Sequence, residues 1–571
     1  MSVGLVRVAA PGRAPSSRDA HVADLFFLAG VLGIVGGAIA FGSRWAAPLE
    51  PVVAIDLRPR ALVAYTLLSL GRGFAAYFLS LGVTLAYGTA AAHSARAARV
   101  LLPLLDVLQS IPVLGFLPGL VLGLVALVPH REAGLELACV IMIFTGQAWN
   151  MVFSFYASLR SIPPEMREAA AVFRLSPWQV FRTVELPSAA IGLVWNSMMS
   201  MAGGWFFLTV AEAFTLGDRD FRLPGVGSYM AVAIERGDTG AMVWGVVAMA
   251  LMILATDQLV WRPLVAFVQQ FKFEESAGGE VPRAWVLDVL GRSVVLAWLR
   301  ALLAGLPTIG AGRPRRPSGR SSVGMIVGWT VVAVAAVVAG AGAYELGHLL
   351  VRVPAAGWAE IAAGLGATML RTTAAVALAA AWTVPVGVLI GRSATASRRL
   401  QPAIQMLASF PAPMLYPFVT AALLFLDIPF GTIAMVLMLL GAQWYVLFNV
   451  IAGASAIPAD LREAADFYRL RGWRRWRTLE LPVVFPYLVT GLITAAGGAW
   501  NASIVAEVVI AHGRTMATTG LGALITQSTA AGDFPLLAAS IVTMATAVVT
   551  INRLGWRRLY RLAETRYAIT R

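Results

Sequence analysis

The chain has 571 residues, of which 58% are hydrophobic and only 13% are charged, and its formal net charge is +14. Soluble domains carry about 45–50% apolar and about 25% charged residues, so this composition excludes a soluble globular protein and makes lipid the solvent for much of the surface. A membrane-spanning helix needs about 20 apolar residues, and the sequence contains about twelve such segments.

The first apolar segment covers residues 24–42 and follows Arg7, Arg13 and Arg18. A basic stretch before an apolar run is typical of a signal peptide, but no small-residue cleavage site follows, and we expect a retained anchor. Further spans are predicted at 66–91, 103–128, 135–158, 187–214 and 240–266. They complete a first half at residues 1–268, with its core at about 66–268.

Ser110 and Pro112 interrupt the third span midway. Proline removes a helix hydrogen bond and releases a carbonyl group, so we expect a hinge or a cavity wall here. Gln147, Asn150 and Asn196 in the following spans are candidates to line a passage. The alternative for each is a hydrogen bond that packs helices together.

Residues 163–175 predict a short amphipathic helix, too short to cross a membrane. Proline is tolerated in its first turn, and Glu165, Glu168 and Arg174 each lie at the end of the helix where the dipole favours their charge. Its narrow apolar face consists of Met166, Ala169, Ala170 and Phe173. Such a helix either packs on its own bundle or binds a partner outside the membrane.

Residues 269–323 are rich in Pro, Gly and Arg and read as a basic cytoplasmic linker. Inside it, residues 284–305 are apolar but contain Asp288, Arg292 and Arg300. We favour an interfacial amphipathic helix for this stretch. The alternative, a thirteenth span, would invert the second half and spoil its charge bias.

The second half, residues 324–571, repeats the first. The segment at 163–187 returns 295 residues further on (Glu168 to Glu463), with 13 of 25 positions identical. The repeated spans fall at 324–350, 366–391, 402–427, 430–455, 482–510 and 534–551. Two halves of one topology predict an all-α polytopic membrane protein built as a parallel pseudo-dimer, with a site between the halves.

The repeat doubles every candidate group. It predicts a second short helix at 458–470 and second passage candidates at Ser409, Pro411, Gln443, Asn449 and Asn501. It also pairs Arg72 with Arg371 and Glu212 with Glu507 as outer-face candidates. The arginines either attract an anion or a binding protein, or reach to the interface. We expect the two glutamates to hydrogen-bond the Gly-rich loops that follow them.

Placing both short helices and both chain ends on one side puts 33 of the 44 Lys and Arg residues on that side. This is the positive-inside bias of a multi-spanning protein, so that side is cytoplasmic. The basic character therefore reflects topology and gives no indication of nucleic-acid binding.

Motifs for chemistry are missing from the sequence. Cys139 is the single cysteine and Lys272 the single lysine, so neither a thiolate metal site nor the Gly-Lys-Ser/Thr of a phosphate-binding loop is present. The histidines have no metal-ligand spacing: His21, His93, His130, His348 and His512. We expect no enzyme and no metal site in this chain.

The Glu-Ala-Ala helix with its Glu-Leu-Pro exit resembles the coupling loop of ABC importer permeases. Trp205…Glu212 and Trp500…Glu507, each followed by Gly-x-Gly, resemble the nitrate/sulfonate/bicarbonate (taurine) branch in its duplicated, fused form. The resemblance implies the type I ABC importer permease fold, with twelve spans in two six-helix halves. It also implies that two cytoplasmic ATPase subunits, which bind the ATP and Mg, dock on Glu165, Arg167, Glu168, Ala169, Ala170 and Arg174, and on Asp460, Arg462, Glu463, Ala464, Ala465 and Arg469.

The same resemblance implies a periplasmic or lipid-anchored solute-binding protein, the bacterial inner membrane as the location, and a small anion as the solute. One departure stands out, because the family usually has Gly where this chain has Arg174 and Arg469. Either the helix runs on into Leu175 and Leu470, or the arginines bind the partner directly. An ion-coupled secondary transporter is the alternative function, although no matched carboxylates lie at midplane depth.

Overall fold

The computed structural model describes residues 54–110, 112–127, 133–216, 219–269, 340, 342, 344–511 and 514–566. The predicted span at 24–42, the linker beyond residue 269 with its segment 284–305, and most of the span at 324–350 lie outside the described residues.

The first half is helical apart from one short hairpin. Its bundle consists of α2 (Ala61–His93), α3 (Ala95–Ser110), η1 (Val113–Phe116), α4 (Leu117–Leu127), α5 (Ala133–Arg160), α8 (Leu186–Glu212), α10 (Thr239–Thr256), η3 (Asp257–Trp261) and α11 (Arg262–Val268). Between α5 and α8 come α6 (Pro164–Val172), α7 (Pro177–Val180) and η2 (Phe181–Glu185). Strands β1 (Thr215–Leu216) and β2 (Arg219–Asp220) pair antiparallel before α9 (Val226–Glu235).

The second half repeats this order. It contains α15 (Ala355–Gly391), α16 (Ala394–Ser409), η5 (Ala412–Leu415), α17 (Tyr416–Phe425), α18 (Phe430–Ser455), α19 (Ala459–Phe467), α20 (Gly472–Arg475), η6 (Trp476–Glu480) and α21 (Leu481–Ala506). The antiparallel strands β3 (Val508–Ala511) and β4 (Arg514–Ala517) lead to α22 (Leu521–Ala531), α23 (Phe534–Ile551), η7 (Asn552–Trp556) and α24 (Arg557–Arg566). The segments η2, η3, η6 and η7 are π-helical and occupy matched positions in the two halves.

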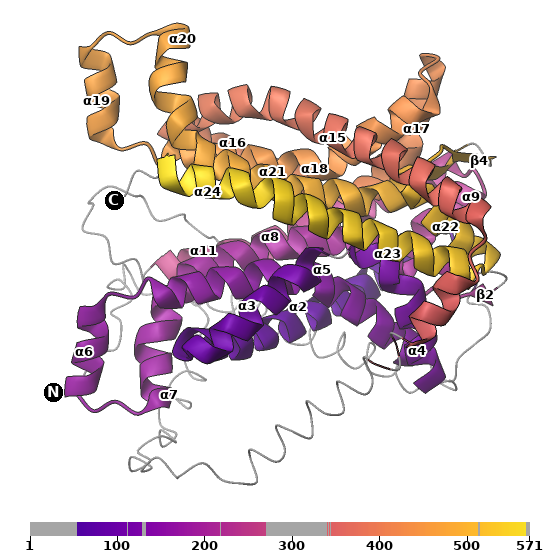
Figure 1. The fold of residues 1–571 in the computed structure, drawn as a ribbon, viewed down its shortest axis with the longest axis horizontal. Coiled ribbons are helices and arrows are strands. Elements are labelled where there is room, and N and C mark those ends of the chain that lie inside the picture. The colour runs from indigo at the N-terminus through magenta and orange to yellow at the C-terminus, as the bar shows by residue number, and fades with distance from the viewer. Residues whose placement is uncertain are drawn as a thin grey trace, which may run out of the picture.

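Each half has the same three-helix centre. In the first half α5 packs against both α2 and α8, and in the second α18 packs against both α15 and α21. The broken third spans cross between the halves: η1 contacts α21 and α3 contacts α23, while α16 contacts α8 and α10. The two halves therefore form one bundle (Figure 1).

The predicted break in the third span is confirmed. In the second half the two helices on either side of Phe410 and Pro411 are bent by 79°. In the first half α3 ends at Ser110 and a 3₁₀ turn begins at Val113. Proline cannot donate the hydrogen bond that would continue the helix.

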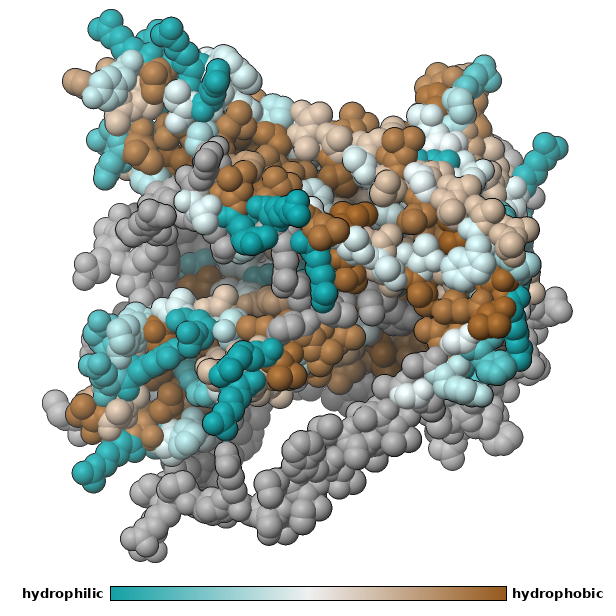
Figure 2. Space-filling model, in the orientation of Figure 1, coloured by the Kyte–Doolittle hydropathy of each residue, from teal (hydrophilic) through white to brown (hydrophobic). Residues whose placement is uncertain are grey.

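Seven of the described helices are long and apolar enough to cross a membrane, or eight if the bent pair counts as one span. The all-α polytopic architecture is confirmed, whereas the count of twelve stays a prediction. Figure 2 shows hydrophobic side chains over the flank of the bundle and hydrophilic ones on the two arms that project from one end. Large apolar side chains that are exposed in the bundle include Phe78, Trp244, Leu251 and Leu370.

Candidate functional site

Two short helices, α6 and α19, project from the same end of the bundle (Figure 1). Each begins after a proline in extended conformation, Pro163 and Pro458, which places Pro164 and Ala459 at the first helical position. α7 and α20 then lead back through the π-helical segments into α8 and α21. Each arm is therefore a helical hairpin continuous with a helix of the bundle.

The apolar face predicted for each short helix is divided between the bundle and solvent. Ala170 and Ala465 are buried, so one point of each helix packs on its own bundle. Phe173 and Tyr468 are 76% and 73% exposed. The other exposed coupling candidates are Glu165, Arg167, Glu168, Ala169, Arg174, Asp460, Glu463, Ala464 and Arg469.

Two of the coupling candidates bind their own chain. Arg167 donates from Nη2 to the carbonyl oxygen of Leu159 at 2.6 Å. The matched Arg462 donates to the carbonyl oxygens of Ala454 and Ser455 at 3.3 and 3.2 Å. These arginines hold the arm to the end of the preceding helix, so the carboxylates and aromatic side chains form the outward surface.

The helix does not run on past Arg174. Arg174 and Arg469 adopt φ angles of 50° and 52°, the left-handed region that favours glycine. The amide of Leu175 donates to Ala170 O at 3.0 Å and that of Arg174 to Ala171 O at 3.0 Å, which is a Schellman turn. The second half repeats both bonds, so the first of our two alternatives, a longer helix, is wrong.

The base of each arm is joined to the second span of its own half by a side-chain contact. His93 Nε2 lies 2.7 Å from Glu185 Oε1 in the first half. In the second half Arg392, at the matched position, lies 3.2 Å from Glu480, which Arg475 also approaches at 3.4 Å. Movement of an arm is thereby linked to two helices of its half.

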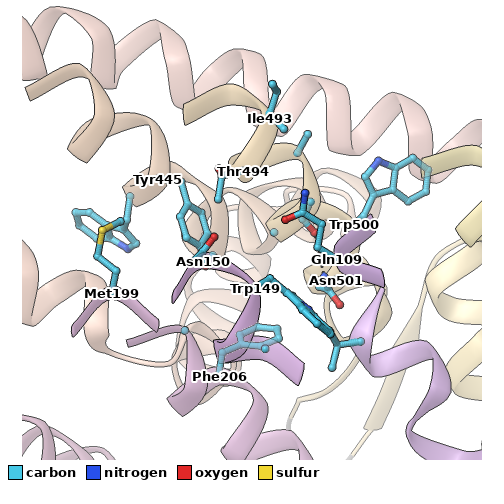
Figure 3. Close-up of a pocket in the computed structure, with 18 of the residues that line it drawn as sticks. Gln109, Trp149, Asn150, Met199, Phe206, Tyr445, Ile493, Thr494, Trp500 and Asn501 are labelled. Atoms are coloured by element: carbon cyan, nitrogen blue, oxygen red, sulfur yellow. Dashed lines mark hydrogen bonds between the residues drawn. The ribbon is translucent and has the colours of Figure 1, made fainter. Parts of the chain in front are cut away.

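A cavity of about 790 Å³ lies between the two halves. Figure 3 shows Trp149, Asn150, Met199 and Phe206 from the first half facing Tyr445, Thr494 and Asn501 from the second. Helices α5, α8, α18 and α21 therefore provide opposite walls. The predicted site between the halves thus coincides with a cavity, and binding of a solute there stays a prediction.

Four of the ten predicted passage residues line this cavity: Pro112, Asn150, Pro411 and Asn501. Five have described side chains outside its lining: Gln147, Asn196, Ser409, Gln443 and Asn449. Asn196 of α8 donates to Ser154 Oγ of α5 at 2.8 Å, as helix-packing hydrogen bonds do. Asn449 donates to the carbonyl of Tyr445, one turn earlier in the same helix, at 2.8 Å. The side chain of Ser110 lies outside the described part of the chain.

Several polar or aromatic residues that line the cavity were not predicted from the sequence. Trp149 and Trp444 recur at the repeat distance, which was a usable signal, but Thr490 and Thr494 correspond to Trp195 and Met199 and so gave no matched signal. Nε1 of Trp149 and Oδ1 of Asn501 are buried without a hydrogen-bond partner among the described residues. None of the described lining side chains is charged.

A buried charge cluster lies toward the opposite end of the bundle from the arms. Arg72 is fully buried, bonded to Glu136 at 2.7 Å and to Glu212 at 2.6 Å. All three interpretations of Arg72, attraction of an anion, contact with a binding protein and reaching to the interface, are therefore wrong, because no part of its side chain is exposed. Glu136 was missed because its position in the other half holds Gly431 and so gave no matched signal.

The expected role of the two glutamates is confirmed. Glu212 Oε2 accepts from the amide of Gly227 at 2.8 Å, and Glu507 Oε2 accepts from that of Ala523 at 3.1 Å. Each carboxylate thus holds the start of the helix that follows its hairpin, α9 or α22.

One protein family matches each half of the chain separately. The family described as "Binding-protein-dependent transport system inner membrane component" matches residues 80–260 and again residues 383–566. The taurine transport system permease protein TauC of Escherichia coli (strain K12) is 30% identical over 210 residues, 36% of this chain and 69% of the relative.

Two cyanobacterial proteins are similar over shorter stretches. The nitrate import permease protein NrtB of Synechocystis sp. is 28% identical over 151 residues, 26% of this chain and 54% of its own length. The bicarbonate transport system permease protein CmpB of Synechococcus elongatus is 28% identical over 144 residues, 25% of this chain and 50% of its own. The chain spans about half the length of these relatives. Since the family matches both halves, the chain belongs to the binding-protein-dependent transport system inner membrane components, the ABC importer permeases, in a duplicated and fused form.

Proposed function

We propose that this chain is the transmembrane subunit of an ATP-driven importer and supplies both walls of the translocation pathway. The observation that carries the proposal is the pair of matched arms at one end of the bundle, each continuous with a helix that lines the central cavity. An exposed helix held by its own Schellman turn, with aromatic and acidic side chains outward, is a surface for a partner.

The partners in this proposal are two cytoplasmic ATPase subunits, one on α6 and one on α19. ATP and Mg bind to those subunits, since the only lysine of this chain is Lys272 and lies outside any phosphate-binding motif. A periplasmic or lipid-anchored binding protein delivers the solute at the other end. The location is the bacterial inner membrane with both termini in the cytoplasm, as the positive-inside bias supports.

The solute in this proposal is a small anion, in line with the nitrate, bicarbonate and taurine named for the relatives. The uncharged lining suits transient binding, because neutral donors such as the indole N–H of Trp149 stabilise an anion without a lasting ion pair. Conduction through a membrane requires binding that is favourable enough for entry and weak enough for release.

Coupling follows from continuity of the chain. Closure of the ATPase pair moves α6 and α19, and the π-helical segments η2 and η6 pass this movement into α8 and α21. Because these two helices face each other across the cavity, their displacement changes which end of it is open.

The test is the double variant Glu168→Arg with Glu463→Arg, reconstituted with the partner ATPase. We expect ATP hydrolysis to become uncoupled from solute uptake while the thermal unfolding of the bundle stays unchanged, because both side chains are exposed. Glu360→Arg, an exposed charge reversal in the first turns of α15, is the matched control. Normal solute-stimulated hydrolysis in the double variant would refute the assignment of α6 and α19 as coupling helices.

The alternative, a secondary transporter coupled to an ion gradient, predicts a different outcome. Uptake would then proceed in vesicles that contain this chain and an ion gradient but no ATPase. The family match and the names of the relatives favour the ATP-driven importer.

A further inference from the structure

The buried cluster of the first half shows how one arginine is saturated by two carboxylates. Nε and Nη2 of Arg72 donate to the two carboxylate oxygens of Glu136, both at 2.7 Å. Nη1 donates to Glu212 Oε1 at 2.6 Å and to Pro224 O at 2.8 Å. The fork of Glu136 is the bidentate arrangement that binds guanidinium most strongly.

The second half repeats only one side of this cluster. Nη1 of Arg371 donates to Glu507 Oε1 at 3.0 Å and to Thr519 O at 2.7 Å, which reproduces the contacts of Glu212 and Pro224. Nη2 donates to Thr518 Oγ1 at 2.9 Å. Gly431 occupies the position that matches Glu136, and among the described residues no carboxylate meets the Nε–Nη2 edge.

The Nε–Nη2 edge of Arg371 lies beside this glycine and beside the Thr518 hydroxyl. A Cβ atom at Gly431 would lie 3.5 Å from Nη2 and 3.8 Å from Nε, an ordinary contact distance. The side chain of Arg371 is 16% exposed, whereas that of Arg72 is 0% exposed. The first half therefore has a closed ion-pair position where the second half has a partly exposed arginine with one carboxylate fewer.

The surrounding backbone also favours negative charge at this place. Glu136 lies in the first turn of α5, whereas the first turn of α18 carries no acidic residue. The amide groups at a helix N-terminus stabilise anions. Arg371 has one carboxylate partner where Arg72 has two, so one further anion would restore the charge balance of the first half.

We propose that the Nε–Nη2 edge of Arg371, beside Gly431, binds one small planar oxyanion of the carboxylate or nitrate type through two parallel hydrogen bonds. The occupant is small because the guanidinium lies mostly below the surface. None of these residues lines the central cavity, so the site lies outside that cavity. The inference does not depend on the proposed function and is tested on the purified chain alone.

The experiment measures the midpoint of thermal unfolding of the detergent-solubilised chain in sodium acetate and in sodium chloride at equal ionic strength. A ligand that binds only the folded state stabilises it by mass action, so acetate is expected to raise the midpoint in a saturable way and by more than chloride. Arg371→Gln is expected to remove the difference.

Two further variants, Gly431→Glu and Glu136→Gly, test the proposal even if Arg371→Gln fails to fold. Gly431→Glu supplies a carboxylate at the position that matches Glu136, and its Cβ atom fits there at ordinary contact distance. We expect this variant to raise the midpoint and abolish the response to acetate. Glu136→Gly opens the equivalent edge of Arg72, and we expect the response to grow. An acetate response of undiminished size in Gly431→Glu, or none in the native chain, would overturn the proposal.

Discussion

At the scale of single residues, the Schellman turns of the two arms are the least expected feature. A left-handed residue other than glycine costs about 1–2 kcal/mol, yet Arg174 and Arg469 both adopt this conformation. Since the helix ends there, the remaining alternative is that these side chains contribute to the partner contact themselves.

The role of these arginine side chains can be tested with the double variant Arg174→Gly with Arg469→Gly. Glycine takes the same φ without strain, so we expect the midpoint of unfolding to be kept or raised. A hydrogen bond to a charged group is worth about 1.5–3 kcal/mol, so the affinity for the partner ATPase should fall about tenfold or more, as measured by titration binding. Unchanged affinity would show that only the backbone turn matters.

Residue-level prediction succeeded where both halves carried the signal. The bonds of Glu212 and Glu507 to the following helix were predicted, because a carboxylate before a Gly-rich loop recurs in both halves. The burial of Arg72 was not predicted, because its partner Glu136 has no counterpart. An ion pair between separate helices leaves no trace in local sequence spacing.

At the scale of helices, glycine sets how closely α15 and α18 approach. A Cβ atom at Gly391 would lie 2.6 Å from Ala454 Cβ and 2.7 Å from the carbonyl oxygen of Ile451. Small residues at such crossings allow the backbones of membrane helices to touch. The arms are attached beyond this contact, since α18 leads directly into α19.

Gly391→Val is therefore expected to destabilise the bundle by about 1–3 kcal/mol, the usual cost of overpacking. Gly366→Val in the same helix is the matched control, because no heavy atom lies within 4 Å of a Cβ built there. Thermal unfolding in detergent measures both. Equal midpoints for the two variants would contradict the role of Gly391 as a packing contact.

The sequence predicted the helices, but it predicted only some of the places where a helix breaks or changes type. Proline marked the breaks at Pro112 and Pro411, and length with amphipathicity marked the arms. The π-helical segments were not predicted, because an i→i+5 hydrogen bond depends on how helices dock and has no compositional rule. The short hairpins β1–β2 and β3–β4 were read only as loops.

At the scale of the whole molecule, the duplication predicted a site between the halves but not which side chains face it. Gln147 and Asn150 lie less than one helical turn apart, yet only Asn150 lines the cavity. Which face of a helix is inward depends on the crossing of the third spans into the opposite half. That arrangement is long-range and cannot be derived from local periodicity.

Under the proposed function, the cavity passes an anion and its described lining side chains are uncharged, so it should not tolerate an added negative charge. Asn501→Asp is expected to reduce uptake tenfold or more, since like charges a few ångströms apart repel by about 1–4 kcal/mol at the effective dielectric of such a site. Asn501→Leu removes the amide without adding charge and is the control. Solute uptake by reconstituted vesicles measures both, and equal rates would argue against an anionic solute at this position.

The walls of the cavity are not copies of each other. Asn150 corresponds to Tyr445, Met199 to Thr494 and Phe206 to Asn501 at the repeat distance (Figure 3). In a transporter made of two identical subunits, two-fold rotation would repeat every group of one wall on the other. An asymmetric solute could then bind in two opposite orientations with equal energy. Because the two halves are parts of one polypeptide, their walls can carry different side chains. The two orientations then differ in energy, so a solute with two unlike ends has one preferred orientation in the cavity.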